Sequence, residues 1–357
     1  MKKIDRYILK KFLKTYVFVV LILVLIICVI DFTEKNDDFI QRAVPGRLIL
    51  EYYLSFVPWI SNLISPITVF IATVFVTARM AAQTEIVAIL ASGVSFRRLM
   101  VPYLIGATMI AILSFFLNAY VIPHANKYRI AFEILYTKKP FYFSDRNIHI
   151  KVGPDAYIYM DRYNNQRDVG YRVTLERINE QNMLEKLHAN RIQWDTTTHK
   201  WQLITWERRM LNKDGETFES GTSMDTTLLL SPEDFKSKDR LWETLTLTEL
   251  NRHIDLQLSR AAEDVQVYYI EKYIRFMQPF SVVILMFIGV IVSARKNRRG
   301  TGYQIALGFL IAFIYIIAFV LAKSIAEANT FNPIVSVWIP NIIFSFVAVF
   351  MYHTVPR

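Results

Sequence analysis

Residues 52–78 read YYLSFVPWISNLISPITVFIATVFVTA and contain no Asp, Glu, Lys, Arg or His. An apolar run of about 20 residues is long enough to cross the hydrocarbon core of a bilayer as a helix. Five further stretches reach or approach that length: 15–30, 99–122, 276–294, 301–322 and 328–352. Flanking residues 12–14 can extend the first of these, because Lys14 can snorkel to the interface. The sequence therefore predicts an α-helical membrane protein with six transmembrane helices.

The composition agrees with a membrane location. Hydrophobic residues make up 53% of the 357-residue chain, and the mean hydropathy is +0.27. A net charge of +10 can indicate nucleic-acid binding, but here the basic residues form short clusters beside the apolar stretches. Such clusters set topology and meet anionic lipid, so no nucleic-acid partner is expected. The single cysteine, Cys28, excludes a disulfide within the chain.

The basic clusters also predict the orientation. They precede the first stretch, lie between the second and third, and lie between the fourth and fifth: Lys2, Lys3, Arg6, Lys10, Lys11 and Lys14; Arg79, Arg97 and Arg98; Arg295, Lys296, Arg298 and Arg299. Alternating spans place all three on one side, which the positive-inside rule makes cytoplasmic, together with both termini. The first stretch is expected to remain as a helix rather than be cleaved as a signal peptide, since its core runs directly into Asp31.

The polar insert between the third and fourth spans has the pattern of β-structure. Residues 148–152 and 171–176 alternate strictly, 201–208 and 218–230 supply further strands, and a bulge near Asn190 would reconcile two alternation phases. Asp214 and Gly215 form a turn signal, and Thr246 to Glu249 form a capping box. We predict transmembrane helices in 1–122, a β-sandwich or jelly-roll with a helical connector in 123–270, and transmembrane helices in 271–357.

The sequence carries no signature of catalysis. Its six histidines are scattered, and no phosphate-binding P-loop or nucleophile elbow is present. We therefore expect no enzyme activity, no metal and no cofactor in this chain, which leaves transport or assembly. The spans are nearly free of ionisable residues, with Lys323 and Glu327 at the outer end of the fifth. A transport function would therefore take its energy from another chain.

One segment between the second and third spans differs from the rest. Residues 79–93 read RMAAQTEIVAILASG, which favours a helix ended by Gly93 but is too short and polar to span a bilayer. Two interpretations fit. It is either an amphipathic helix that binds lipid, or a coupling element that inserts into a cytoplasmic motor.

Three motifs carry a resemblance to a known family: IDRYI at 4–8, QTEIV at 83–87 followed by ASG at 91–93, and FMQPFS at 276–281. They resemble the lipopolysaccharide export permease family over essentially the whole chain, and the first and last are more similar to its G member than to its F member. The resemblance implies an inner-membrane ATP-binding cassette exporter. In it, two six-span permeases, each with a periplasmic β-jelly-roll, pair with a cytoplasmic ATPase dimer.

The resemblance also implies roles for residues. The ATPase-coupling residues would be Arg79, Glu85, Ala91, Ser92 and Gly93. Lipopolysaccharide would enter sideways, between 15–30 of one permease and 301–322 of a sister permease or second copy, and leave towards periplasmic jelly-roll bridge proteins. Its phosphates need cations. The candidate residues on this substrate path are Lys35, Lys127, Arg129 and Lys323.

The chain departs from the family pattern at the outer end of the first span. Relatives tend to carry lysines there, whereas this chain has Asp31, Asp37 and Asp38, and Trp59 follows Pro58. A substrate with fewer phosphates or a bridging divalent cation would accommodate the acids. Two other functions stay open: a membrane-anchored adaptor, and an ATP-driven permease for another amphiphile such as a lipoprotein. Alternation at Ile150 and Val173 fits either a lipid-lined groove or a closed core.

Overall fold

The computed structural model describes residues 3–137, 146–153, 155–179, 182–212, 215–228, 230–235, 240–259, 265–294, 301–328 and 331–353. The chain forms two compact units. The helical unit comprises Met1–Thr137, Trp242–Leu250 and Gln266–Arg357, and the β unit comprises Lys138–Leu241 and Asn251–Val265. Five of the basic residues used for orientation, at 2, 295, 296, 298 and 299, and Asp214 of the expected turn lie outside the described residues.

The prediction of six transmembrane helices with an inserted β domain is confirmed. Six helical segments of the described chain are long and apolar enough to span a membrane. They are α1 (Lys3–Gln41), α3 (Ser65–Ala82), the continuous run Phe96–Tyr136, α9 (Val265–Ser293), α10 (Thr301–Glu327) and α11 (Pro333–His353). The first is much longer than the expected 15–30, because its polar ends continue the helix on both sides.

The expectation of one unbroken helix over 52–78 is wrong. The chain forms α2 (Gly46–Leu63) and then α3, with Ile64 between them. Pro66 lacks an N–H, so it cannot donate to the carbonyl of Asn62 four residues earlier. The side chain of Gln278 on α9 supplies a replacement, with its Nε2 donating to Asn62 O at 2.5 Å. The break is therefore stabilised from a neighbouring helix.

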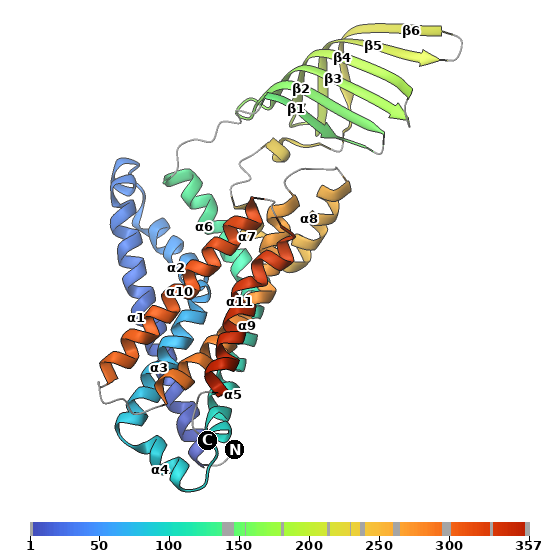
Figure 1. Ribbon diagram of the computed structural model, residues 1–357. Coiled ribbons are helices and arrows are strands. Elements are labelled where there is room, and N and C mark those ends of the chain that lie inside the picture. Colours follow the sequence, from blue (N-terminus) through green and yellow to red (C-terminus); the bar gives the residue numbers. More distant parts are fainter. Residues whose placement is uncertain are drawn as a thin grey trace. The chain divides into compact units, whose positions relative to one another are not determined.

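Residues 79–93 do not form the single helix that was expected. Arg79 belongs to the last turn of α3, and α4 (Glu85–Ala91) begins only after a tight turn at Thr84, whose φ is 62°. Gly93 has a φ of 83°, a conformation that glycine adopts without strain, so it ends this segment as predicted. Figure 1 shows α4 at the same end of the helical unit as the start of α1 and the end of α11.

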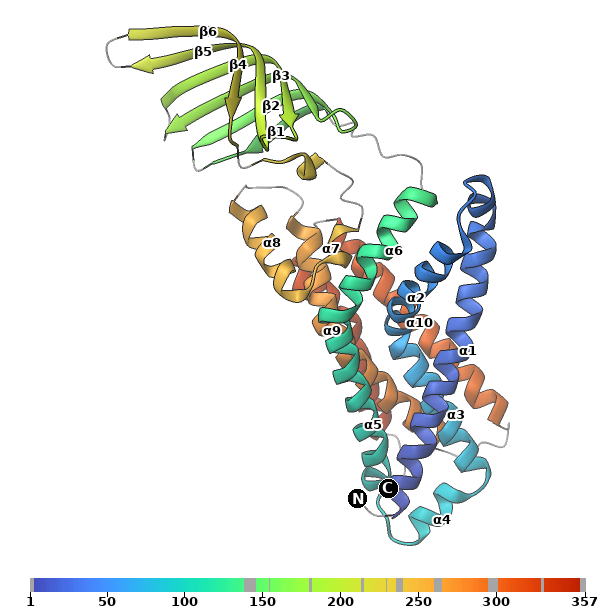
Figure 2. The same ribbon diagram turned by 180° about the vertical axis from the view of Figure 1, so that it is seen from behind.

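The third span continues past Pro123. It runs as α5 (Phe96–Phe116), a π-helical turn η1 (Leu117–Val121) and α6 (Ile122–Tyr136), and Pro123 comes directly after the π-helical turn. Figure 2 shows that α6 lies at the end of the helical unit opposite α4.

The segment that returns from the β unit to the membrane helices contains two short helices. These are α7 (Leu241–Thr244) and α8 (Leu247–Ser259). The capping box is present, because the Thr246 N–H donates to Glu249 Oε2 at 2.8 Å and the Glu249 N–H donates to Thr246 Oγ1 at 3.3 Å. Buried Arg275 of α9 donates to the carbonyls of Trp242 and Leu245 at 2.9 and 2.7 Å. These hydrogen bonds hold the segment against α9, the fourth span.

The β unit is one antiparallel sheet with strands in chain order. They are β1 (Arg146–Lys151), β2 (Ala156–Asn164), β3 (Val169–Asn179), β4 (Asn182–Asp195), β5 (Lys200–Asn212) and β6 (Gly215–Thr226). The sequence analysis missed β2. A 3-10 helix η2 (Pro232–Phe235) follows the sheet.

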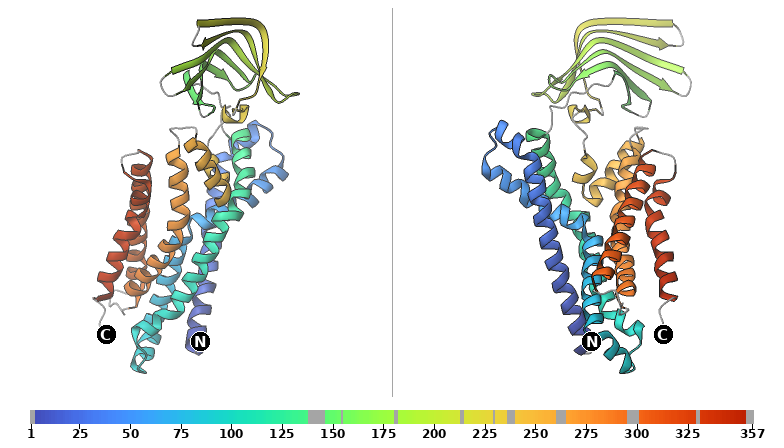
Figure 3. Two further views of the ribbon diagram at one scale, coloured as in Figure 1. Left: turned by 90° about the vertical axis from the view of Figure 1, so that its right-hand side faces the viewer. Right: turned by 60° about the vertical axis from the view of Figure 1, so that its left-hand side comes forward.

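A single row of irregular residues crosses the whole sheet. Every strand pair loses its regular pairing there, at Asn147, Asp161, Arg172, Asn190, Thr205 and Thr222. Three of these residues have φ values of 50–55°. Where a strand passes through this row, consecutive residues that face the core are three positions apart along the strand instead of two. Ala189 and Ile192 are an example. The bulge expected near Asn190 is wrong, because the register is the same on both sides of that residue: Ala189 pairs with Trp206 and Arg191 pairs with Ile204. The irregularity is instead shared by all six strands, and the sheet curves, as Figure 3 shows.

The concave face of the sheet is filled by side chains of this chain. Trp201 is fully buried and its indole donates to Leu230 O at 2.7 Å, while Phe235 stacks on Tyr163 with 3.8 Å between ring centroids. Val173 is also fully buried in this cluster, whereas Ile150 is only partly buried. At Val173 the face is a packed core rather than an open groove.

Candidate functional site

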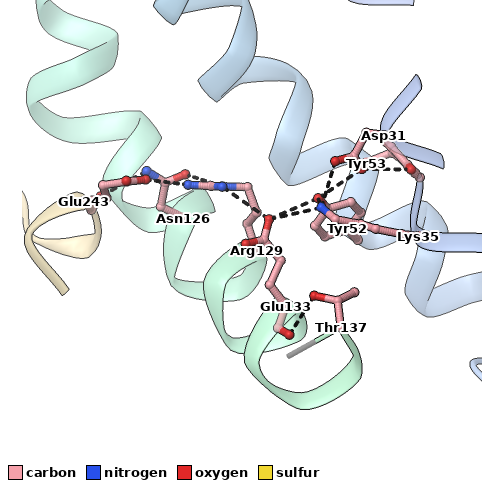
Figure 4. Close-up of polar contacts among 9 residues, drawn as sticks. All are labelled: Asp31, Lys35, Tyr52, Tyr53, Asn126, Arg129, Glu133, Thr137 and Glu243. Atoms are coloured by element: carbon pink, nitrogen blue, oxygen red, sulfur yellow. Dashed lines mark hydrogen bonds and ion pairs between the residues drawn. The ribbon is translucent and has the colours of Figure 1, made fainter. Parts of the chain in front are cut away.

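A buried arginine on α6 organises the first candidate site. The Arg129 side chain is 1% exposed, and its Nη1 and Nη2 lie 3.3 and 2.6 Å from Glu133 Oε1 and Glu243 Oε2. Its Nε donates to Asn126 Oδ1 at 2.9 Å, and its guanidinium lies 3.9 Å from the Trp59 ring centroid. Figure 4 shows these polar contacts converging from α6 and α7. The ion is fully partnered, which is the condition for keeping a charge inside a protein.

Glu133 extends this network to α1 and α2. Its Oε1 lies 3.5 Å from Lys35 Nζ and 3.1 Å from the Tyr52 hydroxyl. Lys35 also pairs with Asp31 Oδ1 at 2.7 Å, and the Tyr53 hydroxyl donates to Asp31 Oδ2 at 3.1 Å. Figure 4 shows the resulting chain of contacts from Asp31 to Glu243. We call this set, Asp31, Lys35, Tyr52, Tyr53, Asn126, Arg129, Glu133 and Glu243, the buried charge network.

Two of the expected substrate contacts, Lys35 and Arg129, are already paired with carboxylates in the buried charge network. Lys35 and Arg129 are both in it, and their two positive charges face three carboxylates, those of Asp31, Glu133 and Glu243. An incoming phosphate would have to displace a carboxylate before reaching either cation. In this conformation, therefore, the two residues hold α1, α2, α6 and α7 together.

The other two expected contacts lie on the surface. Lys127 and Glu249 form an ion pair at 3.4 Å with nearly half of each side chain exposed, and Lys323 and Glu327 form one at 3.7 Å with similar exposure. Exposed pairs contribute only about 0–1 kcal/mol, so little free energy holds these lysines back from an anion. The structure brings Lys35 and Arg129 into one network and leaves Lys127 and Lys323 outside it.

The acidic residues that depart from the family pattern are also divided between the buried charge network and the surface. Asp31 is part of the buried charge network, whereas Asp37 is exposed and Asp38 half-buried on the continuation of α1. Trp59, at the other departure, stacks on Arg129. Asp31 and Trp59 thus serve internal contacts.

The second candidate site is around α4. Glu85 opens this helix, and its carboxylate accepts hydrogen bonds from the Tyr7 hydroxyl at 3.2 Å and from Lys11 Nζ at 3.3 Å. Both donors belong to α1. A second contact, between Arg98 of α5 and Asp5 of α1, lies at 2.5 Å. The N-terminal turns of α1 therefore hold both sides of the α4 segment.

The remaining predicted coupling residues surround α4 but do not share one helix. Arg79 is exposed at the end of α3, and Ala91 is exposed at the end of α4. Ser92 Oγ donates to the Ile89 carbonyl at 2.7 Å, and Gly93 makes the left-handed turn that follows. These residues, which are neighbours in the sequence, therefore form a compact, exposed turn.

Sequence reasoning missed several members of both sites. The spacing of Arg129 and Glu133 is that of a helical ion pair and could have identified Glu133. No comparable signal marks Glu243, which is more than a hundred residues from Arg129. Tyr7 lies within the first motif, but its contact with Glu85 depends on the packing of α1 against the α4 turn.

Comparison with known families gives one match. The model of the lipopolysaccharide export system permease LptF/LptG matches residues 6–354, essentially the whole chain. A search of curated proteins finds no match.

Proposed function

Because the chain belongs to the family of lipopolysaccharide export system permeases LptF/LptG, an inner-membrane transport family, we propose that it works as one of two permeases in an ATP-binding cassette exporter. A cytoplasmic ATPase dimer supplies the energy, and a sister permease or a second copy completes the membrane part. The β unit passes lipopolysaccharide to periplasmic jelly-roll bridge proteins. The matched family comprises both the F and the G permease.

The exposure of the helices carries this proposal. Only 6% of the most apolar window of α1 and 22% of that of α10 are buried, against 72% for α3. These two helices contain the stretches 15–30 and 301–322, where the substrate gate is expected. Apolar side chains such as Phe18 and Phe313 are more than half exposed there. Such surfaces suit a partner permease and the acyl chains of a lipid.

The α4 surface supports the proposed motor contact. Val87 and Leu90 are 53% and 38% exposed on a helix of seven residues, beside the half-buried Glu85. Apolar side chains next to one charged group are typical of a docking surface. We propose that this turn enters a cleft of the ATPase and moves when the ATPase closes. Lipid A phosphates then meet Lys127 and Lys323 first, because the buried charge network neutralises Lys35 and Arg129.

The motor contact is tested with Glu85→Lys in the assembled complex. We expect transport and ATPase retention to fall by about tenfold or more, the effect of losing one interface residue worth about 1.4 kcal/mol. Co-purification of the ATPase and lipopolysaccharide release from proteoliposomes measure the effect. Glu34→Lys, an exposed reversal on α1, is the matched control. Tyr7→Phe removes the hydroxyl that donates to Glu85 and accepts from Lys11 but keeps the Lys11–Glu85 ion pair, so it should retain the ATPase. Normal transport by Glu85→Lys would contradict the proposal.

The proposed orientation is tested by cysteine labelling in a Cys28→Ser background. A cysteine at Asn36, near the outer end of α1, should react with an impermeant thiol reagent added to intact cells. A cysteine at Thr84, an exposed position before α4, should react only after the cells are opened. Labelling of the second site in intact cells would invert the topology.

A further inference from the structure

A groove in the helical unit lies outside the proposed substrate path. It has a volume of about 490 Å³ and opens between α5, α9 and α11. The lining residues of α5 begin at Arg97 and those of α11 at Ser345, and both sets follow the spacing i, i+3, i+4, i+7. That spacing presents one face of each helix, with α9 as the floor. Every lining residue except Arg97 and Ser345 is apolar or aromatic.

The groove continues along α11. A neighbouring cavity of about 300 Å³ shares Ile284, Ser345 and Val349 with it and reaches Trp338. Tyr352 and Trp338 are 14 residues apart on α11, which corresponds to about 21 Å at ~1.5 Å per residue. Half of a ~30 Å hydrocarbon core is ~15 Å. The groove is therefore long enough for an acyl chain to cross its own leaflet.

The end of the groove nearest the start of α5 carries a positive charge. Arg97 Nε donates to the Tyr352 hydroxyl at 2.7 Å, and the guanidinium carbon lies 5.9 Å from the Tyr352 ring centroid. Across the described part of the chain no carboxylate pairs with Arg97, whereas the adjacent Arg98 pairs with Asp5. Tyr352 therefore orients an exposed guanidinium whose remaining N–H groups can bind an anion.

We propose that this groove binds a glycerophospholipid from the leaflet at the α4 end of the helical unit. One acyl chain lies along α11, and the phosphate pairs with Arg97. An apolar channel with an arginine at its polar end matches the two parts of such a lipid. A helix from another protein would cover the apolar faces but would leave Arg97 unmatched. The site uses neither α1 nor α10, so it is independent of the proposed export path.

Photo-crosslinking in vesicles tests the proposal. The full-length protein is placed in phosphatidylethanolamine and phosphatidylglycerol vesicles with a trace of phosphatidylglycerol that carries a diazirine on one acyl chain. We expect crosslinks to concentrate on the groove residues Leu104, Phe287 and Ala348 rather than on lipid-facing Phe313. Ala348→Phe fills the groove and should lower this labelling by about fivefold, roughly 1 kcal/mol. Val347→Phe, the adjacent exposed position outside the groove, is the matched control and should leave it unchanged.

A second arm tests the headgroup. Arg97→Glu should weaken labelling by phosphatidylglycerol at Ala348, whereas Arg97→Lys should retain part of it. If the groove and Phe313 are labelled equally in the unchanged protein, and Ala348→Phe does not lower the labelling, the groove holds ordinary surrounding lipid. That result would overturn the proposal. Displacement of the phospholipid probe from Ala348 by lipopolysaccharide, when both are supplied, would also overturn it.

Discussion

The two ends of the helical unit use charged residues differently. At the α6 end, the side chains of Arg129 and Glu133 are 1% and 7% exposed and lie in a continuous network. At the α4 end, the Lys11 and Glu85 side chains are 22% and 27% exposed and form a smaller cluster. A buried charge is costly to leave unpaired, so the first set fixes helix positions. A partly exposed charge can exchange its partner for another protein at lower cost, which suits a docking surface.

The largest expected effect comes from breaking the buried end. Arg129→Met leaves Glu133 and Glu243 without their arginine, so we expect unfolding in detergent to be easier by about 3–5 kcal/mol. Equilibrium unfolding followed by tryptophan fluorescence measures it. Arg129→Lys keeps the positive charge but not the several N–H donors of the guanidinium, and it should lose less stability. A loss under about 1 kcal/mol for the methionine variant would remove the distinction between the two ends.

An intermediate effect is expected at the α4 end. Asp5→Asn weakens the contact with Arg98, whose side chain is 38% exposed and can be hydrated by water instead. The expected loss is about 1–2 kcal/mol, since a hydrogen bond to a charged group contributes about 1.5–3 kcal/mol before this compensation. The same unfolding assay applies. A loss as large as that of the Arg129 variant would show that this end is held as rigidly as the other.

The smallest effect is expected for the exposed pair at the α6 end. Lys127→Ala should cost less than about 1 kcal/mol at neutral pH. The backbone N–H of Thr246, followed by its hydroxyl and by Lys127, lowers the pKa of Glu249 below its ordinary value. A carboxyl whose folded pKa is lowered stabilises the fold above its unfolded pKa of about 4.3 and loses this contribution as pH falls further. Acid titration of the unfolding midpoint should therefore show a smaller fall in Glu249→Gln than in the unchanged protein. Identical titrations would contradict the capping role.

Part of the architecture could be predicted because its signals are local. Length and hydropathy identify the membrane helices, and alternation identifies most strands, since both depend on periods along the chain. The same rule misplaced Tyr171. Alternation puts it in phase with Val173, but the irregular residue Arg172 intervenes, and it is Gly170 that faces Met160 and Ile192. The alternation rule assumes that every second residue faces the core, so it cannot predict a place where the spacing is three residues.

The break in the second span shows the same limit in the membrane helices. Pro58 and Pro66 both lie in the apolar run, yet only the second coincides with a break, while α2 continues through the first. The outcome depends on whether another helix satisfies the freed carbonyl, as Gln278 does for Asn62. Gln278 was visible as part of a family motif, but its role depends on a contact between segments more than two hundred residues apart.

By itself, the sequence determined that the chain has six apolar membrane helices and a β insert, and that one short segment between spans carries Glu85. These follow from the free energy of burying apolar surface and satisfying backbone groups, which is set mainly by neighbouring residues. Only the tertiary structure decided which cations are neutralised. Lys35 and Arg129 looked equivalent to Lys127 and Lys323, but packing placed Glu133 beside Lys35 and Glu243 beside Arg129. A charge interacts with whatever lies within a few ångströms, and those neighbours come from distant parts of the chain.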